Sequence, residues 1–317
     1  MSIIEKAAKK LGIPASPAPA LTTQEPQIQA ESGSFIEAAL AHGHSTPEPR
    51  EPVSEMVSNI ADSIESQVNT VVTNVVQNVD LSRLRKMGAI TPDTEKSQVA
   101  EEFRIIKRPL IANAFGQGTA KVKNGNLIMI TSSLPGEGKT FCAINLAISM
   151  AMEMDRTVLL VDADVARPRI PEYLGLHADL GFLDVLQDKK LKLPDVLIRT
   201  NIAKLTVLPA GRTYKRATEL LASAAMIRLV EDIGNRYHDR IIIFDSPPLL
   251  ATSEANVLAT HMGQIVMVVE AEKTSQEALT EALNHIQSCE VVGMLLNKTT
   301  PTPGADYYYG YYGSYGK

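Results

Sequence analysis

Residues 132–141 read SSLPGEGKTF, a combination of residue types that can bind the phosphates of a nucleotide. Compared with the pattern G-x-x-x-x-G-K-[ST], the segment has Gly138, Lys139 and Thr140 in place, while Ser133 stands at the position of the first glycine. Glycines let backbone N–H groups approach a phosphate, and the positive end of a following helix attracts its charge. We therefore expect Lys139 to contact the β- and γ-phosphates of ATP and the Thr140 hydroxyl to bind Mg²⁺. The residues expected to bind the nucleotide through this loop are Pro135, Gly136, Glu137, Gly138, Lys139, Thr140 and Phe141.

Three aspartates follow apolar runs of the kind that form buried strands. Asp162 and Asp164 lie two residues apart in VDADVARP, on one side of an extended chain, and Asp245 ends IIIFD. Such carboxylates can hold a hydrated Mg²⁺, and one near the γ-phosphate can orient or deprotonate an attacking hydroxyl; capping a helix is an alternative role for Asp164. The set indicates nucleotide-dependent phosphoryl transfer. We expect the catalytic residues to be Lys139, Asp162 and Asp164, and the metal ligands to be Thr140, Asp162, Asp164 and Asp245.

Short apolar runs that alternate with amphipathic segments must position these residues. The runs cover residues 127–131, 157–162, 205–209, 241–245, 264–270 and 291–297, and a helix-like run, residues 97–115, precedes them. Near-continuous apolar strands between helices are typical of a mostly parallel sheet covered by helices on both faces. In such sheets ligands bind beyond the carboxyl ends of the strands. The sequence therefore predicts an α/β fold with the phosphate loop and the aspartates at one edge of its sheet.

The composition is that of a globular protein. Of the 317 residues, 44% are hydrophobic and 21% are charged, and the formal net charge is -5. This acidic balance gives no electrostatic reason to expect nucleic acid as a partner. Cys142 and Cys289 are too few for a disulfide framework and lack metal-ligand spacing. No stretch approaches the roughly 20 apolar residues of a membrane span, so we expect a cytoplasmic protein.

The first 95 residues have the pattern of an extension to the catalytic domain. Residues 1–12 form either a helix that docks on a partner or a frayed terminus, and residues 14–52 are rich in proline and typical of a disordered linker. Apolar residues at three-to-four spacing over residues 53–85 predict one long amphipathic helix. The predicted organisation is an N-terminal extension (1–95), a catalytic domain (96–300) and a flexible tail (301–317).

The tail concentrates the phenols of the chain. Six of the nine tyrosines lie in the last eleven residues, YYYGYYGSYGK, namely Tyr307, Tyr308, Tyr309, Tyr311, Tyr312 and Tyr315. Tyrosines interrupted by glycines cannot pack a core, but a flexible tether lets them enter the active site of a neighbouring copy. The alternative is an adhesive low-complexity tail. Beside a phosphoryl-transfer site, the tail is predicted to be the phosphate acceptor.

Taken together, SSLPGEGKT, LLVDADVARP, IIIFDSPP and the tyrosine cluster resemble the bacterial tyrosine autokinases of exopolysaccharide synthesis. The segments SIIEKA, DLSRLRKMG and EEFRIIKRPL are similar to the branch associated with exosortase-linked gene clusters. The resemblance covers residues 80–317 and, more loosely, the first twelve. It implies a P-loop fold of the deviant Walker A type, as in MinD and ParA proteins, and transfer of the ATP γ-phosphate to C-terminal tyrosines of a neighbouring copy, by which exopolysaccharide polymerisation and export are regulated.

The resemblance also implies roles for single residues. Asp162 would be the base toward a tyrosine hydroxyl, Asp164 and Asp245 would serve the metal, and Asn297 would contact the adenine. Relatives assemble as rings through a helical E-x-x-R-x-x-R pattern, and the corresponding positions here are Glu101, Arg104 and Lys107. Ion pairing within the helix is the alternative role of these three residues. A lysine at the last position cannot reproduce a bidentate guanidinium contact.

Partners are likewise implied by the resemblance. We expect a membrane-embedded chain-length determinant of the Wzz type as activator, self-association, a tyrosine phosphatase, and recruitment to the inner face of the cytoplasmic membrane. A rival function is an ATP-hydrolysing switch of the ParA and MinD type without kinase activity. Such switches carry a lysine early in the phosphate loop, where this chain has Ser132, Ser133 and Leu134. A non-catalytic assembly module is opposed by the intact lysine and aspartates.

Overall fold

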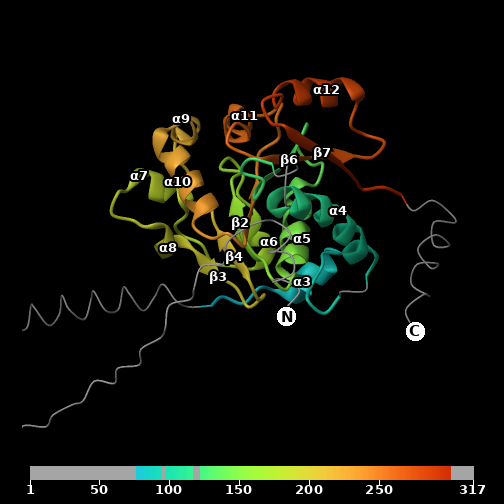
Figure 1. Ribbon diagram of the computed structural model, residues 1–317, viewed down its shortest axis with the longest axis horizontal. Helices are drawn as coiled ribbons and strands as arrows, with labels where there is room; N and C mark the ends of the chain where they lie inside the picture. The colour runs from blue at the N-terminus through green and yellow to red at the C-terminus, as the bar shows by residue number, and fades with distance from the viewer. Residues whose placement is uncertain (1–75, 95–96, 117–121, 301–317) are drawn as a thin grey trace, which may run out of the picture. The chain divides into compact units, whose positions relative to one another are not determined.

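The computed structural model describes residues 76–94, 97–116 and 122–300, and a seven-stranded sheet forms the centre of this part of the chain (Figure 1). The strand order is β3-β4-β2-β5-β1-β6-β7. All neighbouring strands are parallel except β3 and β4, which confirms the predicted mostly parallel sheet. Only β3, two residues long and antiparallel, was not predicted. The strands are β1 (Leu127–Ser132), β2 (Thr157–Asp162), β3 (Ile198–Arg199), β4 (Leu205–Leu208), β5 (Arg240–Asp245), β6 (Gln264–Glu270) and β7 (Val291–Asn297).

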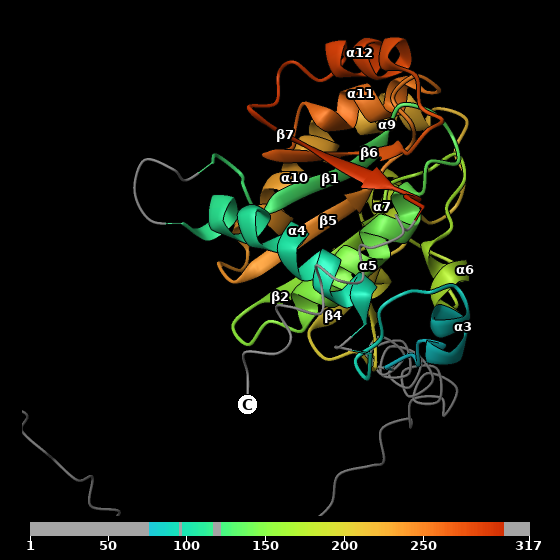
Figure 2. The ribbon, with the colours of Figure 1, turned by 90° about the vertical axis from the view of Figure 1, so that its right-hand side faces the viewer.

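Helices cover both faces of the sheet, as predicted. Figure 2 shows α4 and α5 on one side of the strands and α11 and α12 on the other. The described helices are α3 (Leu81–Lys86), α4 (Gln98–Phe115), α5 (Lys139–Ala151), α6 (Ile170–Leu174), α7 (Phe182–Gln187), α8 (Leu193–Val196), α9 (Ala217–Leu221), α10 (Ala224–Asn235), α11 (Ser253–Ala259) and α12 (Gln276–Asn284). Helix α4 matches the helix-like run over residues 97–115.

The central strands β1, β2 and β5 are mostly apolar because both of their faces are buried, whereas the edge strand β7 exposes Met294 and Leu296. Along β1, Ile128 and Ile130 pack on the side of α4 and α5, while Leu127 and Met129 pack on the side of α10 and α11. Alternate side chains of a strand point to opposite faces, so a strand between two helical layers needs apolar residues at every position. This burial fixes the register of the strands, and with it the position of the polar residues that follow them.

The core extends into residues that the sequence assigned to the N-terminal extension. Val79, Leu84 and Ile90 are at most 4% exposed and belong to the core on the α5 side. One helix was predicted over residues 53–85, of which the structure describes only residues 76–85. In that part the prediction is wrong, because residues 76–80 are not helical and Gln77 forms an isolated bridge to Thr200. A separate helix, α3, begins after Asp80, which caps it. Residues 79–90 therefore contribute to the same hydrophobic core as α4 and α5.

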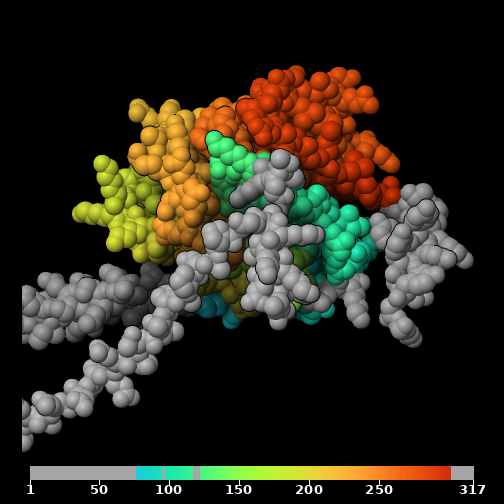
Figure 3. All heavy atoms as spheres, viewed as in Figure 1, coloured from blue at the N-terminus to red at the C-terminus, as the bar shows by residue number. Residues whose placement is uncertain are grey.

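In the space-filling view, side chains of the C-terminal third (orange to red) pack directly against those of the α4 region (teal) (Figure 3).

Within the described ranges, no helix is long and apolar enough to cross a bilayer. Cys142 and Cys289 are free thiols, in agreement with the sequence. The predicted N-terminal docking helix, the proline-rich linker and the tail tyrosines lie outside the described residues.

Candidate active site

The phosphate loop joins β1 to α5 and depends on two glycines. Gly136 and Gly138 have φ angles of 92° and 99°, in the left-handed region that side chains rarely adopt. A Cβ atom on Gly138 would lie 2.1 Å from the side-chain nitrogen of Asn297. Gly138 also precedes the first turn of α5, so the free N–H groups of this helix face the loop. The local geometry is that of a cradle for an anion.

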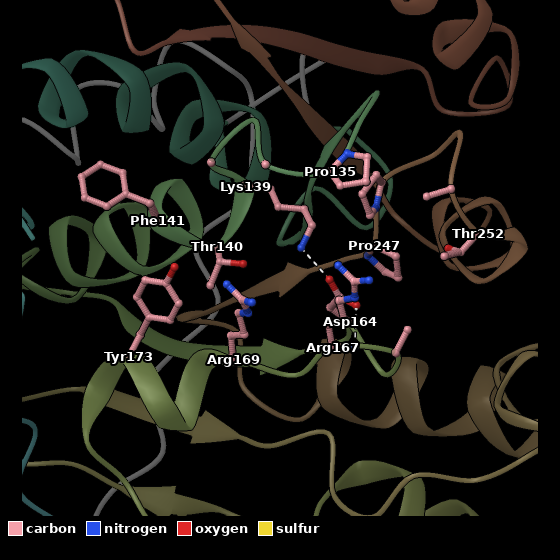
Figure 4. Close-up of a pocket in the computed structure, with 15 residues that line it drawn as sticks. Pro135, Lys139, Thr140, Phe141, Asp164, Arg167, Arg169, Tyr173, Pro247 and Thr252 are labelled. Atoms are coloured by element: carbon pink, nitrogen blue, oxygen red, sulfur yellow. Dashed lines mark hydrogen bonds and ion pairs between the residues drawn. The ribbon is translucent and has the colours of Figure 1, made fainter.

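Lys139 brings the ends of β2 and β5 together. Its ammonium donates to Asp164 Oδ2 at 2.6 Å, as Figure 4 shows, and lies 3.8 Å from Asp245 Oδ1. Strands β2 and β5 pair with Asp162 opposite Asp245, so the lysine faces a cluster of carboxylates. Burial of Lys139 disfavours its charge, but the charges of Asp245 and Asp164 outweigh burial and raise its pKa. The cation is therefore held in place at the carboxyl edge of the sheet.

Asp162 is a buried carboxylate with an abnormal pKa. Burial and then the charge of Asp245, with a smaller part from Asp164, raise the pKa of Asp162 to about 8. The backbone N–H of Ile170, at the start of α6, donates to its Oδ2 at 2.9 Å and opposes this rise. Its Oδ1 is buried and has no hydrogen-bond partner among the described residues. One oxygen of this carboxylate is thus free to accept a proton or contact a cation.

Asp245 is also completely buried. Burial raises its pKa to about 6, although Lys139 and Thr140 both favour its ionised form. Both of its carboxylate oxygens are buried without a geometrically normal hydrogen-bond partner in the described structure. Buried acceptors without donors are costly, and a divalent cation satisfies them.

These oxygens fit Mg²⁺. Within the part of the chain that the structure describes, no three His, Cys, Asp or Glu side chains converge into a complete metal cage. Mg²⁺ does not need such a cage, because it is commonly bound by one or two carboxylates together with the phosphates of a nucleotide. Asp162, Asp245 and the Thr140 hydroxyl could supply the protein ligands of such an ion.

A cavity of about 620 Å³ opens in front of the loop. Asp162 and Asp245 are completely buried and do not line it. The predicted residues that line it are Pro135, Gly136, Gly138, Lys139, Thr140, Phe141 and Asp164. The lining residues that were not assigned from the sequence include Arg167, Arg169 and Tyr173 (Figure 4). The available signal was their position in the first eleven residues after the end of β2, where the site of a parallel sheet lies.

Glu137 and Asn297 were predicted to bind the nucleotide, but their side chains instead hold the phosphate loop through contacts with residues near β6 and β7. The Glu137 carboxylate accepts from the Leu134 N–H at 2.8 Å and from the Thr274 hydroxyl. The Asn297 amide donates to the Glu137 carbonyl at 2.9 Å, and the Lys298 ammonium donates to a further loop carbonyl at 2.7 Å. Neither the Glu137 nor the Asn297 side chain lines the cavity. These contacts hold the shape of the phosphate loop.

The three residues predicted for ring assembly have different environments on α4. Glu101 and Arg104 pair with each other, and both side chains are about half exposed. Lys107 is only 6% exposed, and its ammonium lies 2.7 Å from the Ser149 carbonyl and 2.7 Å from Glu153 Oε1. Lys107 therefore joins α4 to α5 within the subunit, which leaves Glu101 and Arg104 on the surface.

The chain is similar to known proteins in sequence and in fold. The family described as AAA domain matches residues 125–297. The tyrosine-protein kinase YwqD of Bacillus subtilis is 31% identical over 235 residues, which cover 74% of this chain and 94% of YwqD. The putative tyrosine-protein kinase CapB of Staphylococcus aureus is 28% identical over 235 residues, covering 72% and 98%. Among solved structures, the chimerical protein CapA2B2 matches with a TM-score of 0.60 and 26% identity, covering 76% of this chain and 99% of that one.

Proposed function

Because this chain belongs to the bacterial tyrosine-protein kinases of exopolysaccharide synthesis, we propose that it transfers the γ-phosphate of ATP to the tyrosines of its own C-terminal tail, from one copy to another. Kinase activity toward protein tyrosine follows from the family. The observation that carries the proposal is the position of Lys139, which lies between Asp164 and Asp245 behind a glycine loop and faces a cavity large enough for a nucleotide. We also place the chain in the exosortase-associated branch, on its N-terminal motifs.

In the proposed complex, the backbone N–H groups of the loop and the start of α5 bind the ATP phosphates. Lys139 exchanges its contact with Asp164 for the β- and γ-phosphates, so its charge stays paired in both states. Bound Mg²⁺ would neutralise phosphate charge, held by Thr140 and the carboxylates of Asp162, Asp164 and Asp245. Positioning and charge neutralisation are the main contributions that phosphoryl transfer needs from a protein.

The proton of the attacking phenol is assigned to Asp162. The tyrosine oxygen forms a bond to the γ-phosphorus, the bond from that phosphorus to the β–γ bridging oxygen breaks, ADP leaves, and the phenol proton passes to a carboxylate. The resemblance to the family implies Asp162 for this role, and its Oδ1 has no hydrogen-bond partner among the described residues. Asp164 faces the cavity more directly, so substitutions at both positions are needed to assign the base.

The acceptors are proposed to be Tyr307, Tyr308, Tyr309, Tyr311, Tyr312 and Tyr315. These residues lie outside the described structure, and their assignment rests on the sequence of the tail. The tail follows β7 after three residues, and the last residue of that strand contacts the phosphate loop. Glycines between the tyrosines suit a segment that must present several phenols in turn.

Assembly and partners form the remaining part of the proposal. Glu101 and Arg104 are exposed on α4 and suit contacts between copies in a ring, while Lys107 is engaged within the subunit. A membrane-embedded chain-length determinant of the Wzz type would recruit the kinase to the inner face of the cytoplasmic membrane and activate it. A tyrosine phosphatase would reset the tail. Each added phosphate brings about -1.5 to -2 charges, so a phosphorylated tail would repel its neighbours.

Mass spectrometry of the full chain after incubation with Mg²⁺-ATP tests the proposal. We expect phosphotyrosine confined to the tail, its loss in Lys139→Met, and its loss in Asp162→Ala. Retention of phosphotyrosine in Asp162→Ala with loss in Asp164→Ala would transfer the role of base to Asp164. ATP hydrolysis without any protein phosphate would contradict the kinase proposal and favour the nucleotide switch.

A further inference from the structure

Residues 76–91 cross the surface next to the nucleotide site and are here called the strap. The strap contains α3 and carries the DLSRLRKMG segment, which the proposed chemistry does not use. Its buried residues are Val79, Leu84, Ala89, Ile90 and Thr91, none more than 7% exposed. This segment is thus a packed part of the domain, although it precedes every strand of the sheet.

Gln77 fixes the strap to the loop after α6 and to the end of β3. Its side chain donates to the His177 carbonyl at 3.0 Å and accepts from the His177 N–H at 2.9 Å. Its backbone N–H donates to the Arg199 carbonyl, and its carbonyl accepts from the Asn201 N–H. Four hydrogen bonds thus hold one residue, two of which depend on the glutamine side chain.

Helix α6 joins this contact to the catalytic centre. At its last residue, the Leu174 carbonyl accepts from the Asp80 N–H of the strap at 2.9 Å. At its first residue, the Ile170 N–H donates to Asp162 Oδ2 at 2.9 Å. Between these ends the helix contributes Tyr173 to the cavity wall, and Arg169 lines the cavity just before it. A helix of five residues is only about 7 Å long, so a shift at one end reaches the other.

A second contact joins the strap to α5. The Ile90 N–H donates to Asn145 Oδ1 at 2.7 Å, in a completely buried position. The Asn145 amide donates in turn to the Phe141 carbonyl at 2.7 Å, in the first turn of the helix that begins at Lys139. Phe141 lines the cavity. The strap therefore contacts α5 and α6, two of the elements that contribute residues to the wall of the nucleotide site.

We propose that the strap sets the geometry of the nucleotide site and is energetically coupled to nucleotide binding, with Gln77 as a positioning residue that acts through α6. This inference rests on the proposed function only in placing a nucleotide in the cavity. Coupling between two sites is reciprocal, so nucleotide binding must stabilise the strap as much as the strap favours binding. A partner that displaces the strap, including one bound to the chain that precedes it, lowers nucleotide affinity. By the same reciprocity, nucleotide lowers the affinity of that partner by an equal factor.

Hydrogen exchange of the full chain, with and without Mg²⁺ and a non-hydrolysable ATP analogue, tests this coupling. The informative amides are those of Gln77, Val79, Asp80 and Ile90, whose acceptors are all outside the strap. We expect the analogue to slow their exchange. A fluorescent analogue should bind about fivefold more weakly to Gln77→Ala, and the KM for ATP should rise more than kcat falls.

Two further variants separate coupling from a general loss of structure. Gln77→Glu keeps the acceptor for the His177 N–H and loses the donor to the His177 carbonyl. Its affinity for the analogue should therefore lie between those of the unsubstituted protein and Gln77→Ala. Arg85→Ala removes an exposed ion pair between the strap and Asp93, two residues beyond it, without touching α6, so this variant should bind the analogue normally. Equal weakening by Arg85→Ala and Gln77→Ala, or analogue binding that leaves the strap amides unprotected, would overturn the inference and leave the proposed function intact. A wild-type chain that binds no analogue would contradict the proposed function itself.

Discussion

Replacing Asp162 with asparagine should remove much of the pH dependence of the stability of the ligand-free protein. The pKa of Asp162 is raised from 3.8 to about 8, first by burial and then by the neighbouring carboxylates. Between these two values the folded protein retains a proton that the unfolded chain has released. The free energy of unfolding therefore falls by about 1.4 kcal/mol per pH unit as the pH rises. From pH 5 to pH 8 this amounts to about 3 to 4 kcal/mol, which Asp162→Asn abolishes.

Urea unfolding at pH 5, 6, 7 and 8, without nucleotide and with EDTA present, measures this difference. From pH 5 to pH 8, the free energy of unfolding of the variant relative to that of the unsubstituted protein should rise by about 3 to 4 kcal/mol. Asp93→Asn is the matched control, because the Thr91 hydroxyl lowers the pKa of that exposed carboxylate, which leaves it ionised in both states above pH 5. Parallel pH dependences for Asp162→Asn and the unsubstituted protein would refute the reasoning.

Two other substitutions test the geometry around the site. Lys107→Ala should lower the free energy of unfolding by about 2 kcal/mol in urea titrations, because it removes the contacts of a buried ammonium with the Ser149 carbonyl and the partly exposed Glu153 carboxylate; unchanged stability would contradict the internal role of this lysine. Gly138→Ala should abolish nucleotide binding in a fluorescence titration, because the added Cβ meets the left-handed backbone and the Asn297 amide. Gly88→Ala, also left-handed but with nothing within 4 Å of its Cβ, should cost about 1–2 kcal/mol of stability and keep binding; equal losses of binding in the two variants would count against the cradle.

The sequence predicted the fold and the convergence of charged residues because both depend on periodicities that the sheet enforces. A strand buried on both faces must be apolar until its end, so the first polar residue after each run marks the edge of the sheet. This reasoning led to Asp162 and Asp245, which pair across β2 and β5 in the structure. The loop was predicted from its pattern of glycines, lysine and threonine. In the structure Gly136 and Gly138 occupy φ angles that few other residues tolerate, which is why the pattern needs glycine there.

What the sequence did not predict depends on contacts between distant segments. Positions three apart on a helix turn by about 300° at each step, so Glu101 and Lys107 differ by about 120° in direction. Lys107 consequently reaches the core while Glu101 remains on the surface. The side chain of Glu137 turns away from the cavity because Thr274, far along the chain, offers it a hydroxyl. The packing of residues 76–91 likewise depends on Leu174 and Asn145, which no local pattern indicates.

The strand order has a consequence for how the kinase is made. β1 lies between β5 and β6, both of which are synthesised more than a hundred residues later. While the ribosome is still translating, β2 can pair with β4, but β1 has no neighbour at either edge. An apolar strand in that condition is a target for chaperones and for aggregation. The nucleotide pocket takes residues from Pro135 to Thr252, so translation products that end before this stretch is complete lack kinase activity from the outset.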